Sequence, residues 1–197
     1  TYPPADVLDF GPTGTSVDPY TTLRLQLATV TEAEEIASRM TITPEPPDGW
    51  DPARAYSWRD WTYSLRLAPM TTYKVQLDKG AEDTHGQAYA TPLEFSFTTG
   101  HLRPMVDAAS GARIYPANNA TELPTRTRNV RSLHVGVESL KPAEAMRMMG
   151  DYSTFSRSQR RLSGHSTLFE GRDLDDRVHV DTIDLAEHLG ETGHGFV

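Results

Sequence analysis

The chain has 197 residues, 37% hydrophobic and 23% charged, which is the composition of a globular protein with one large domain or two small ones. Its formal net charge of −8 argues against binding nucleic acid or an anionic membrane, because such surfaces need clustered Lys and Arg. The absence of cysteine excludes disulfides, thiolate metal sites and an internal thioester within these residues. No apolar run approaches the ~20 residues of a membrane-spanning helix.

The first half of the chain reads as short strands separated by Gly- and Pro-rich turns. Thr31 and Glu34 have the spacing of a capping box, which predicts one or two helical turns between strands. The glycine after Asp83-Thr84-His85 supplies the positive φ of a tight turn. This pattern is typical of an all-β sandwich that ends at Thr99-Gly100. Alternating apolar side chains predict its strands over residues 7–10, 22–28, 40–43, 63–67, 71–78 and 95–100.

The second half is less regular. Residues 123–131 lead into 132–140, where Leu133, Val135 and Val137 share one face and predict a central strand. Pro142 suits the first position of a short helix that would end at Met149. We expect loops or ragged strands over 150–176. Further strands are predicted over 112–115 and 178–183, with a helical turn over 185–189.

Metal binding has little support in the sequence. A calcium loop needs several oxygen ligands at regular spacing, and near Gly86 only Asp83 and Glu82 offer charge, so a hydrogen-bonded turn is favoured. His179 alternates with Val178 and Val180, which predicts that its side chain lies on a solvated strand face. No two histidines have the i, i+4 spacing of a metalloprotease helix. The histidines are His85, His101, His134, His165, His179, His188 and His194.

A serine hydrolase triad could be assembled on paper from Ser166, His165 or His179, and Asp181. The Gly-x-Ser-x-Gly turn that presents such a serine is missing, and these residue types are common enough to occur together by chance. We therefore predict no catalytic residue, no cofactor-binding residue and no metal ligand, and we expect the chain not to be an enzyme.

Trp50, Trp58 and Trp61 lie close together in sequence and could form a platform that stacks on a sugar. Large aromatic side chains are also favoured on strands and under loops, where they bury much apolar area. Packing is therefore favoured over ligand stacking.

Several weaker signals also have a structural explanation. Gly11-Pro-Thr-Gly14 follows a strand but precedes neither a helix nor Gly-Lys-Ser, so a phosphate loop is unsupported. Arg157-Ser-Gln-Arg-Arg161 is expected to be a solvated loop, and Asn119 begins a glycosylation sequon that marks a loop able to be exposed. Three methionines could form an adaptable face, although a helix covering a sheet edge is favoured: Met146, Met148 and Met149.

Two groups of segments resemble known families. Residues 72–78, 83–86 and 95–100 resemble bacterial Ig-like domains of the Big family. Residues 123–140, followed by Pro142-Ala-Glu-Ala, are similar to an early macroglobulin domain of bacterial α2-macroglobulins. In that domain a Leu-Pro-(Val/Thr)-x-Thr-x-Asn-Val segment precedes a strand and a short helix. Residues 180–186 resemble a late segment of the same domain.

The resemblance implies an all-β chain of two antiparallel β-sandwich domains in tandem, with short helical inserts. Residues 1–100 would be a bacterial Ig-like domain and residues 101–197 a macroglobulin-like domain, truncated at its C-terminus. We expect the chain to be an internal part of a longer polypeptide. It starts at Thr1 without a leader sequence, and its last residues, 194–197, look like the opening of another strand.

The resemblance also implies a structural role. Full-length members of the family trap and inhibit proteases after a bait region is cleaved, and many hold the protease through a thioester. This sequence contains neither part. Members are often exported lipoproteins that face the periplasm, some associated with a peptidoglycan synthase. The implied partners are other macroglobulin domains of the same chain, proteases and such a synthase.

Two alternatives to the scaffold role remain open from sequence. One is a tandem Ig-like stalk of a bacterial surface adhesin, in which a distant tip would carry the ligand specificity. The other is a carbohydrate-binding accessory module, which would depend on the three tryptophans alone.

Overall fold

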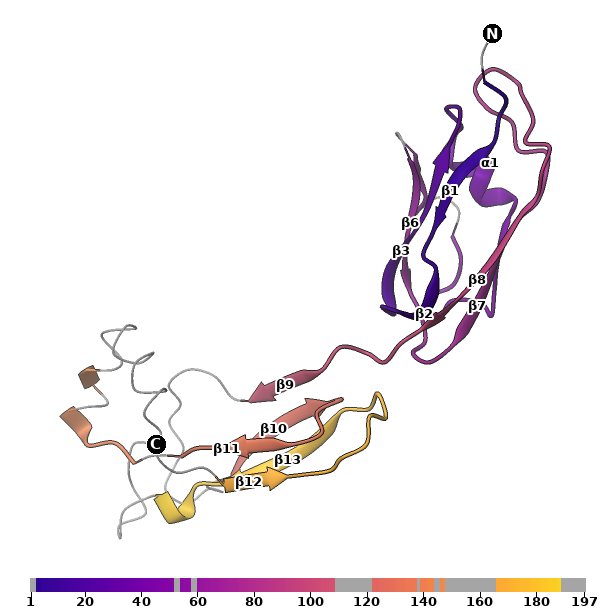
Figure 1. The fold of residues 1–197 in the computed structure, drawn as a ribbon. Helices are drawn as coiled ribbons and strands as arrows, with labels where there is room; N and C mark the ends of the chain where they lie inside the picture. Colours follow the sequence, from indigo (N-terminus) through magenta and orange to yellow (C-terminus); the bar gives the residue numbers. More distant parts are fainter. Residues whose placement is uncertain are drawn as a thin grey trace. The chain divides into compact units, whose positions relative to one another are not determined.

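The computed structural model of the chain describes residues 3–51, 54–57, 60–108, 122–137, 139–143, 146–147 and 166–188. The chain divides into two compact units, Thr1–Leu102 and Arg103–Val197. Strands are the main element of both units (Figure 1). The first unit contains β1 (Val7–Gly11), β2 (Gly14–Val17), β3 (Tyr20–Leu27), α1 (Ala33–Ser38), β4 (Met40–Thr43), β5 (Tyr56–Ser57), β6 (Asp60–Arg66), β7 (Thr72–Leu77) and β8 (Leu93–Thr99). The second contains β9 (Met105–Ala108), β10 (Glu122–Arg128), β11 (Leu133–Val135), β12 (Ser166–Phe169), β13 (His179–Asp184) and η3 (Ala186–His188).

The first unit is a sandwich of two four-stranded sheets. One sheet has the strand order β1-β3-β6-β5 and the other has the order β2-β8-β7-β4, and Figure 1 shows them as two layers. Neighbouring strands are antiparallel, except that β2 runs parallel to β8. The predicted all-β sandwich is confirmed, with this one parallel pair as an addition.

Alternation along the strands places the apolar side chains of both sheets in one core. In β6, Trp61, Tyr63 and Leu65 are buried, whereas Ser64 and Arg66 are exposed. Each large apolar side chain buried in this way stabilises the fold by about 1.5–3 kcal/mol. The other strands contribute Leu23 and Leu25 from β3, Ile42 from β4, Tyr73, Val75 and Leu77 from β7, and Phe95 and Phe97 from β8.

The N-terminal segment contributes a strand to each sheet. β1 pairs with β3 in the first sheet, and β2, which begins three residues after β1 ends, pairs with β8 in the second. Gly14 has a φ of 101°, which is unstrained only for glycine. Gly11–Gly14 is therefore the crossing between the sheets, which accounts for Gly14 without a phosphate site.

The end of β8 is fastened to the rest of the sandwich by hydrogen bonds. The Thr99 hydroxyl is buried; it accepts from the Thr71 N–H at 2.9 Å and donates to the Ala68 carbonyl at 2.7 Å. The Gly100 N–H donates to the Val17 carbonyl at 2.8 Å. A Cβ at Gly100 would lie 2.9 Å from the Ser16 Oγ, so a larger side chain there would require Ser16 to move.

The helical insert forms as expected, but its predicted cap is wrong. α1 begins at Ala33 with Glu32 as the N-cap residue, and no side chain caps it. Thr31 is buried instead, and its hydroxyl makes a 2.8 Å hydrogen bond with the Tyr89 hydroxyl. A threonine that is needed inside the core cannot also turn outward to cap the helix.

In the second unit, the described strands form a three-stranded sheet, β13-β10-β9, and a two-stranded sheet, β11-β12. The predicted central strand over 132–140 is wrong, because β11 covers only Leu133–Val135 and pairs with β12. β10, which was expected to be a lead-in, is the central strand and pairs with both β9 and β13. The inward side chains Thr125 and Thr127 of β10 are buried but polar, so an apolar pattern misses this strand.

Two of the remaining predicted elements in the second unit are confirmed, and others lie partly or wholly outside the described residues. β13 confirms the strand predicted over 178–183, and η3 lies within the helical turn predicted over 185–189. Residues 142–143 and 146–147 are helical, while Met148, Met149 and the strand predicted over 112–115 lie outside the described residues. Within the described part of the chain, no helix combines the length and apolar character needed to cross a bilayer.

We expect Leu25→Ala to lower the free energy of unfolding of the first unit by about 2–5 kcal/mol, because it leaves a cavity in the core. All three tryptophans fall within residues 1–102, so denaturant unfolding followed by tryptophan fluorescence reports on this unit. Gln26→Ala, on the exposed face of the same strand, is the control and should change stability by less than about 0.5 kcal/mol. Equal losses for both variants would contradict the assigned core.

Candidate functional site

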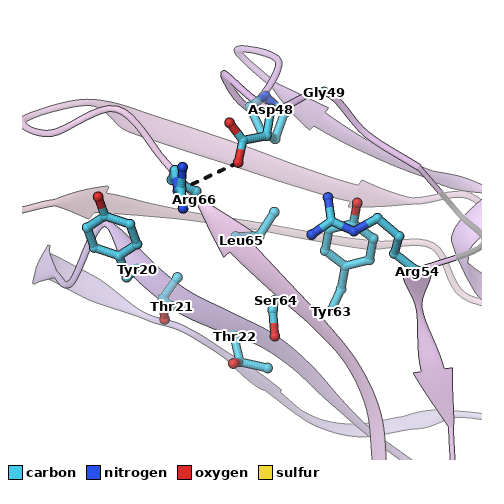
Figure 2. Close-up of a pocket in the computed structure, with 11 residues that line it drawn as sticks. Tyr20, Thr21, Thr22, Asp48, Gly49, Arg54, Tyr63, Ser64, Leu65 and Arg66 are labelled. Carbon is cyan, nitrogen blue, oxygen red and sulfur yellow. Dashed lines mark ion pairs between the residues drawn. The ribbon is translucent and has the colours of Figure 1, made fainter.

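A cavity of about 350 Å³ lies beside β6 in the first unit. One wall is the end of β6, from Tyr63 to Arg66, together with Tyr20 to Thr22 of β3 (Figure 2). The other wall is the segment that joins β4 to β5, which contributes Pro46, Asp48, Gly49 and Arg54. We call this cavity the β6 groove.

Charged and aromatic side chains line the β6 groove. The Arg66 Nε lies 3.6 Å from the Asp48 Oδ2, and Figure 2 shows this ion pair between strand and loop. The Arg66 guanidinium also lies over the Tyr20 ring, 5.4 Å from its centre, and the Arg54 guanidinium lies 5.7 Å from the centre of the Tyr63 ring. Both arginines are exposed, so their guanidinium groups stay accessible to a ligand.

The aromatic cluster next to the groove is part of the core. Trp61 is fully buried, and its indole N–H donates to the Ala33 carbonyl at 3.0 Å. Trp50 is half-buried, with its ring centre 4.3 Å from that of Tyr63. The Tyr63 hydroxyl in turn accepts from the Asp51 N–H at 3.1 Å, which holds the loop on the sheet. The predicted packing role is confirmed for Trp50 and Trp61, which are tilted by 39° to each other; Trp58 lies outside the described residues.

The Asp83 turn has the structure predicted for it. The buried Asp83 carboxylate accepts from the backbone N–H groups of His85 and Gln87, both at 2.8 Å, and Gly86 has a φ of 76°. Desolvation raises the pKa of Asp83, but the hydrogen bonds from Gln87 and His85 lower it more, so the net pKa is below its ordinary value. Both backbone bonds use Asp83 Oδ1, and Oδ2 lies 3.5 Å from the Gln87 side-chain amide, so the carboxylate closes the turn.

The interior of the described part of the second unit contains a polar cluster. Arg172 makes two hydrogen bonds to the Asp181 carboxylate, at 2.9 and 2.8 Å, and a third to the Thr127 hydroxyl at 3.0 Å. Its guanidinium lies 3.7 Å from the centre of the Phe169 ring. One arginine thus ties β10, β12 and β13 together. The hydrogen bonds from Arg172 lower the pKa of Asp181 despite the opposing effect of desolvation.

His179 lies on the inward face of β13, which corrects the prediction of a solvated face. Val178 and Val180 are the exposed residues, at 52% and 64%, whereas His179 is half-buried with its Nε2 3.0 Å from both oxygens of Asp175. The hydrogen bond from His179 lowers the pKa of Asp175. The inward face of β13 carries His179 and Asp181 as well as Ile183, so the exposed Val178 and Val180 misled the prediction of which face is buried.

Among the described residues of the hypothetical serine hydrolase triad, none is hydrogen-bonded to another. His179 bonds to Asp175, Asp181 bonds to Arg172, and Ser166 lies on β12 opposite Val135. His165 lies outside the described residues. The described residues also contain no group of three or more His, Asp or Glu side chains placed to hold a metal ion.

The other sequence signals lie apart. His134 contacts the Thr167 hydroxyl at 3.1 Å, and His188 accepts at its carbonyl from the Ser139 hydroxyl. Met146 is 73% exposed. Outside the described residues are Asn119, 157–161 and His194. The clearest feature that the sequence pattern missed is the bidentate pair of Arg172 with Asp181, since no spacing rule links an arginine in a loop to a later strand.

The pair of Arg172 with Asp181 predicts a pH-dependent stability of the second unit. Because the pKa of Asp181 is lowered by folding, its contribution is present above its unfolded pKa of about 3.9 and is lost as the pH falls through the folded value. Asp181→Asn should lower the free energy of unfolding near neutral pH by about 1–3 kcal/mol and flatten its fall in acid.

The measurement is urea unfolding at several pH values, followed through the amide NMR signal of Thr127. Arg126→Met, on the exposed face of β10, is the control and should leave both the stability and its pH dependence unchanged. A fall in acid that is equally steep in the Asp181→Asn variant would contradict the assigned role of this pair.

Comparison with known proteins places this geometry in context. Residues 4–99 match the bacterial Ig-like domain family. A crystal structure of a mutant of Salmonella alpha-2-macroglobulin has a TM-score of 0.64 and 18% identity over 94% of this chain and 12% of its own. A second structure of Salmonella alpha-2-macroglobulin, reacted with methylamine, has a TM-score of 0.61 and 17% identity over 92% of this chain and 11% of its own.

These likenesses concern the fold, and the sequence matches no curated protein. The chain spans about an eighth of the length of the two Salmonella structures. The resemblance inferred from residues 72–100 and 123–140 is thereby confirmed at the level of the fold. Residues 4–99 are thus similar to bacterial Ig-like domains, and the chain as a whole has a fold found in bacterial alpha-2-macroglobulin.

Proposed function

We propose that the chain supplies two structural scaffold domains to a bacterial alpha-2-macroglobulin-like protein. The observation that carries the proposal is one structural likeness, with a TM-score of 0.64, that extends over 94% of the chain and therefore over both units. The order of the two units agrees with this likeness: an Ig-like domain comes first, and a second unit of β-sheets follows it directly.

The internal structure of both units suits a scaffold. In the first unit the large side chains that might have bound a ligand, Trp61 and Tyr63 among them, are used for packing. In the second, the charged side chains of Arg172 and Asp181 are used to join strands. On this proposal the domains are residues 1–100, of the bacterial Ig-like type, and residues 101–197, of the macroglobulin type.

The proposed parent protein would trap proteases in the cell envelope, and its other macroglobulin domains would be the immediate partners of this chain. A periplasmic location, a lipid anchor and a peptidoglycan synthase as partner belong to the same proposal. The bait and thioester chemistry would reside elsewhere in the parent, since this sequence has no cysteine. The chain itself would be neither an enzyme nor an inhibitor.

An adhesin stalk is the second candidate, because a match to the bacterial Ig-like family over residues 4–99 is also what a stalk module would give. A stalk predicts further Ig-like repeats and a surface anchor in the parent gene. The scaffold proposal predicts further macroglobulin domains and a bait region. Sequencing the complete reading frame separates the two.

The functional test compares the full-length parent with this chain alone. We expect the parent to block protease hydrolysis of a large protein substrate while sparing a small chromogenic peptide, because a trap excludes by size. This chain alone should alter neither rate. Deleting residues 1–197 from the parent should weaken the protection without creating activity toward the peptide.

The same experiment can refute the proposal. Reproducible hydrolysis by this chain alone, abolished by Ser166→Ala or His179→Ala, would show an enzyme. Full protection of the large substrate by a stable parent that lacks residues 1–197 would show that these domains are not part of the trap.

A further inference from the structure

We propose that the β6 groove binds an extended acidic peptide segment of a partner protein, which adds a strand to the edge of β6. The proposal does not depend on the function proposed above. It follows from unpaired backbone groups on β6, from the shape of the groove and from its charge.

The direction of the backbone groups on β6 follows from its pairing with β3. The Leu67 N–H donates to the Pro19 carbonyl at 2.8 Å. The backbone N–H and C=O groups of every second residue toward the start of β6, including Leu65 and Tyr63, therefore also point to β3. The N–H and C=O groups of Ser64 and Arg66 therefore point to the opposite edge. There β5 pairs only with Trp61 and Thr62.

β5 is short because the preceding chain turns away. If its register with β6 continued, residue 54 would lie opposite Ser64. Instead the Arg54 N–H donates to the Asp51 carbonyl at 3.1 Å, which closes a turn. Within the part of the chain that the structure describes, no backbone hydrogen bond joins Ser64 or Arg66 to this loop. The edge thus keeps an unused set of donors and acceptors, the feature that strand addition requires.

The groove has room for a segment of chain beside this edge. Its volume of about 350 Å³ is at the lower end of ligand-binding cavities, and the loop with Asp48 and Gly49 lines it opposite β6. Tyr20, at 50% exposure, offers an aromatic surface at one end. The lining follows consecutive residues of two strands, 20–22 and 63–66, which suits an extended peptide better than a compact ligand.

The charge of the groove favours an acidic peptide. Its charged lining residues are Arg54, Arg66 and Asp48, an excess of one positive charge in a chain of net charge −8. The 3.6 Å separation of Arg66 Nε from Asp48 exceeds the usual 2.7–3.2 Å of a hydrogen bond, so Arg66 retains donors for a second carboxylate. Side chains two residues apart in an extended peptide point the same way, so alternate acidic residues would reach the groove together.

The test uses the intact chain and a synthetic probe, acetyl-Glu-Val-Glu-Val-Glu-Thr-Gly-amide. NMR titration should shift the amide signals of Ser64 and Arg66, and bound peptide should slow hydrogen exchange at both. A peptide with Lys in place of Glu should bind at least about tenfold more weakly at low salt. N-methylation of the Glu-Val-Glu backbone should abolish binding, because strand addition needs its N–H groups.

Two variants locate the site. Arg54→Glu should weaken binding of the acidic probe at least about tenfold, whereas Lys79→Glu, the same charge change on an exposed turn, should not. Ser64→Pro removes a donor on the groove side and should abolish binding; tryptophan fluorescence checks that the variant is folded. Arg54→Glu and the N-methylated peptide test the proposal even if Ser64→Pro fails to fold.

Three results would overturn the proposal. These are equal affinity for the Glu and Lys probes, signal shifts confined to residues outside the groove, and no shift at millimolar peptide. A fourth such result is concentration-dependent dimerisation that protects the Ser64 amide, which would assign the edge to a second copy of this chain.

Discussion

The first unit depends on the packing of alternate apolar side chains from two facing sheets. Leu23 and Leu25 of β3 and Trp61 of β6 meet Val75 and Phe97 from the opposite sheet, and all five are essentially inaccessible to solvent. The loop beside β6 rests on the same core, since the Tyr63 hydroxyl holds the Asp51 N–H. The β6 groove therefore has one wall made of core strand and another anchored to it, which gives it a defined shape.

The described part of the second unit is held together on a different physical basis. Its inward face uses Thr125, Thr127 and Asp181, and its best-connected side chain is Arg172. A half-buried arginine that makes three hydrogen bonds and covers an aromatic ring supplies direction as well as energy, because a bidentate pair fixes both partners. Asn129 and Asp176 add a reciprocal pair of hydrogen bonds, at 2.6 and 3.0 Å, between two turns. Solvent conditions that alter charge should therefore affect this unit more than the first.

The accuracy of the sequence prediction follows this contrast. In the first unit, β4 and β7 lie where alternation predicted them, because the buried face is apolar and the period of two is visible. β10 was mistaken for a lead-in, since Pro124 interrupts it and its buried residues are threonines. The predicted buried face of β13 is wrong, because Val178 and Val180 are exposed and His179 and Asp181 point inward.

The β6 groove could not have been found from the sequence. Its charged residues are separated along the chain, and the unpaired edge arises only because the turn at Asp51 to Arg54 ends β5 early. Likewise the partner of Arg172 is set by how a loop folds onto β13, which no local pattern encodes.

The crossing at Gly11–Gly14 has a consequence for how the first unit could fail. One short ribbon, β1 followed by β2, covers a border strand in each layer: β3 in one and β8 in the other. Detachment of β1 and β2 would expose the unpaired backbone edges of β3 and β8 at the same time. Such edges pair with other chains and promote aggregation. Anchorage of β1 and β2 thus protects β3 and β8 against intermolecular sheet growth, although these two strands contribute little of the apolar interior.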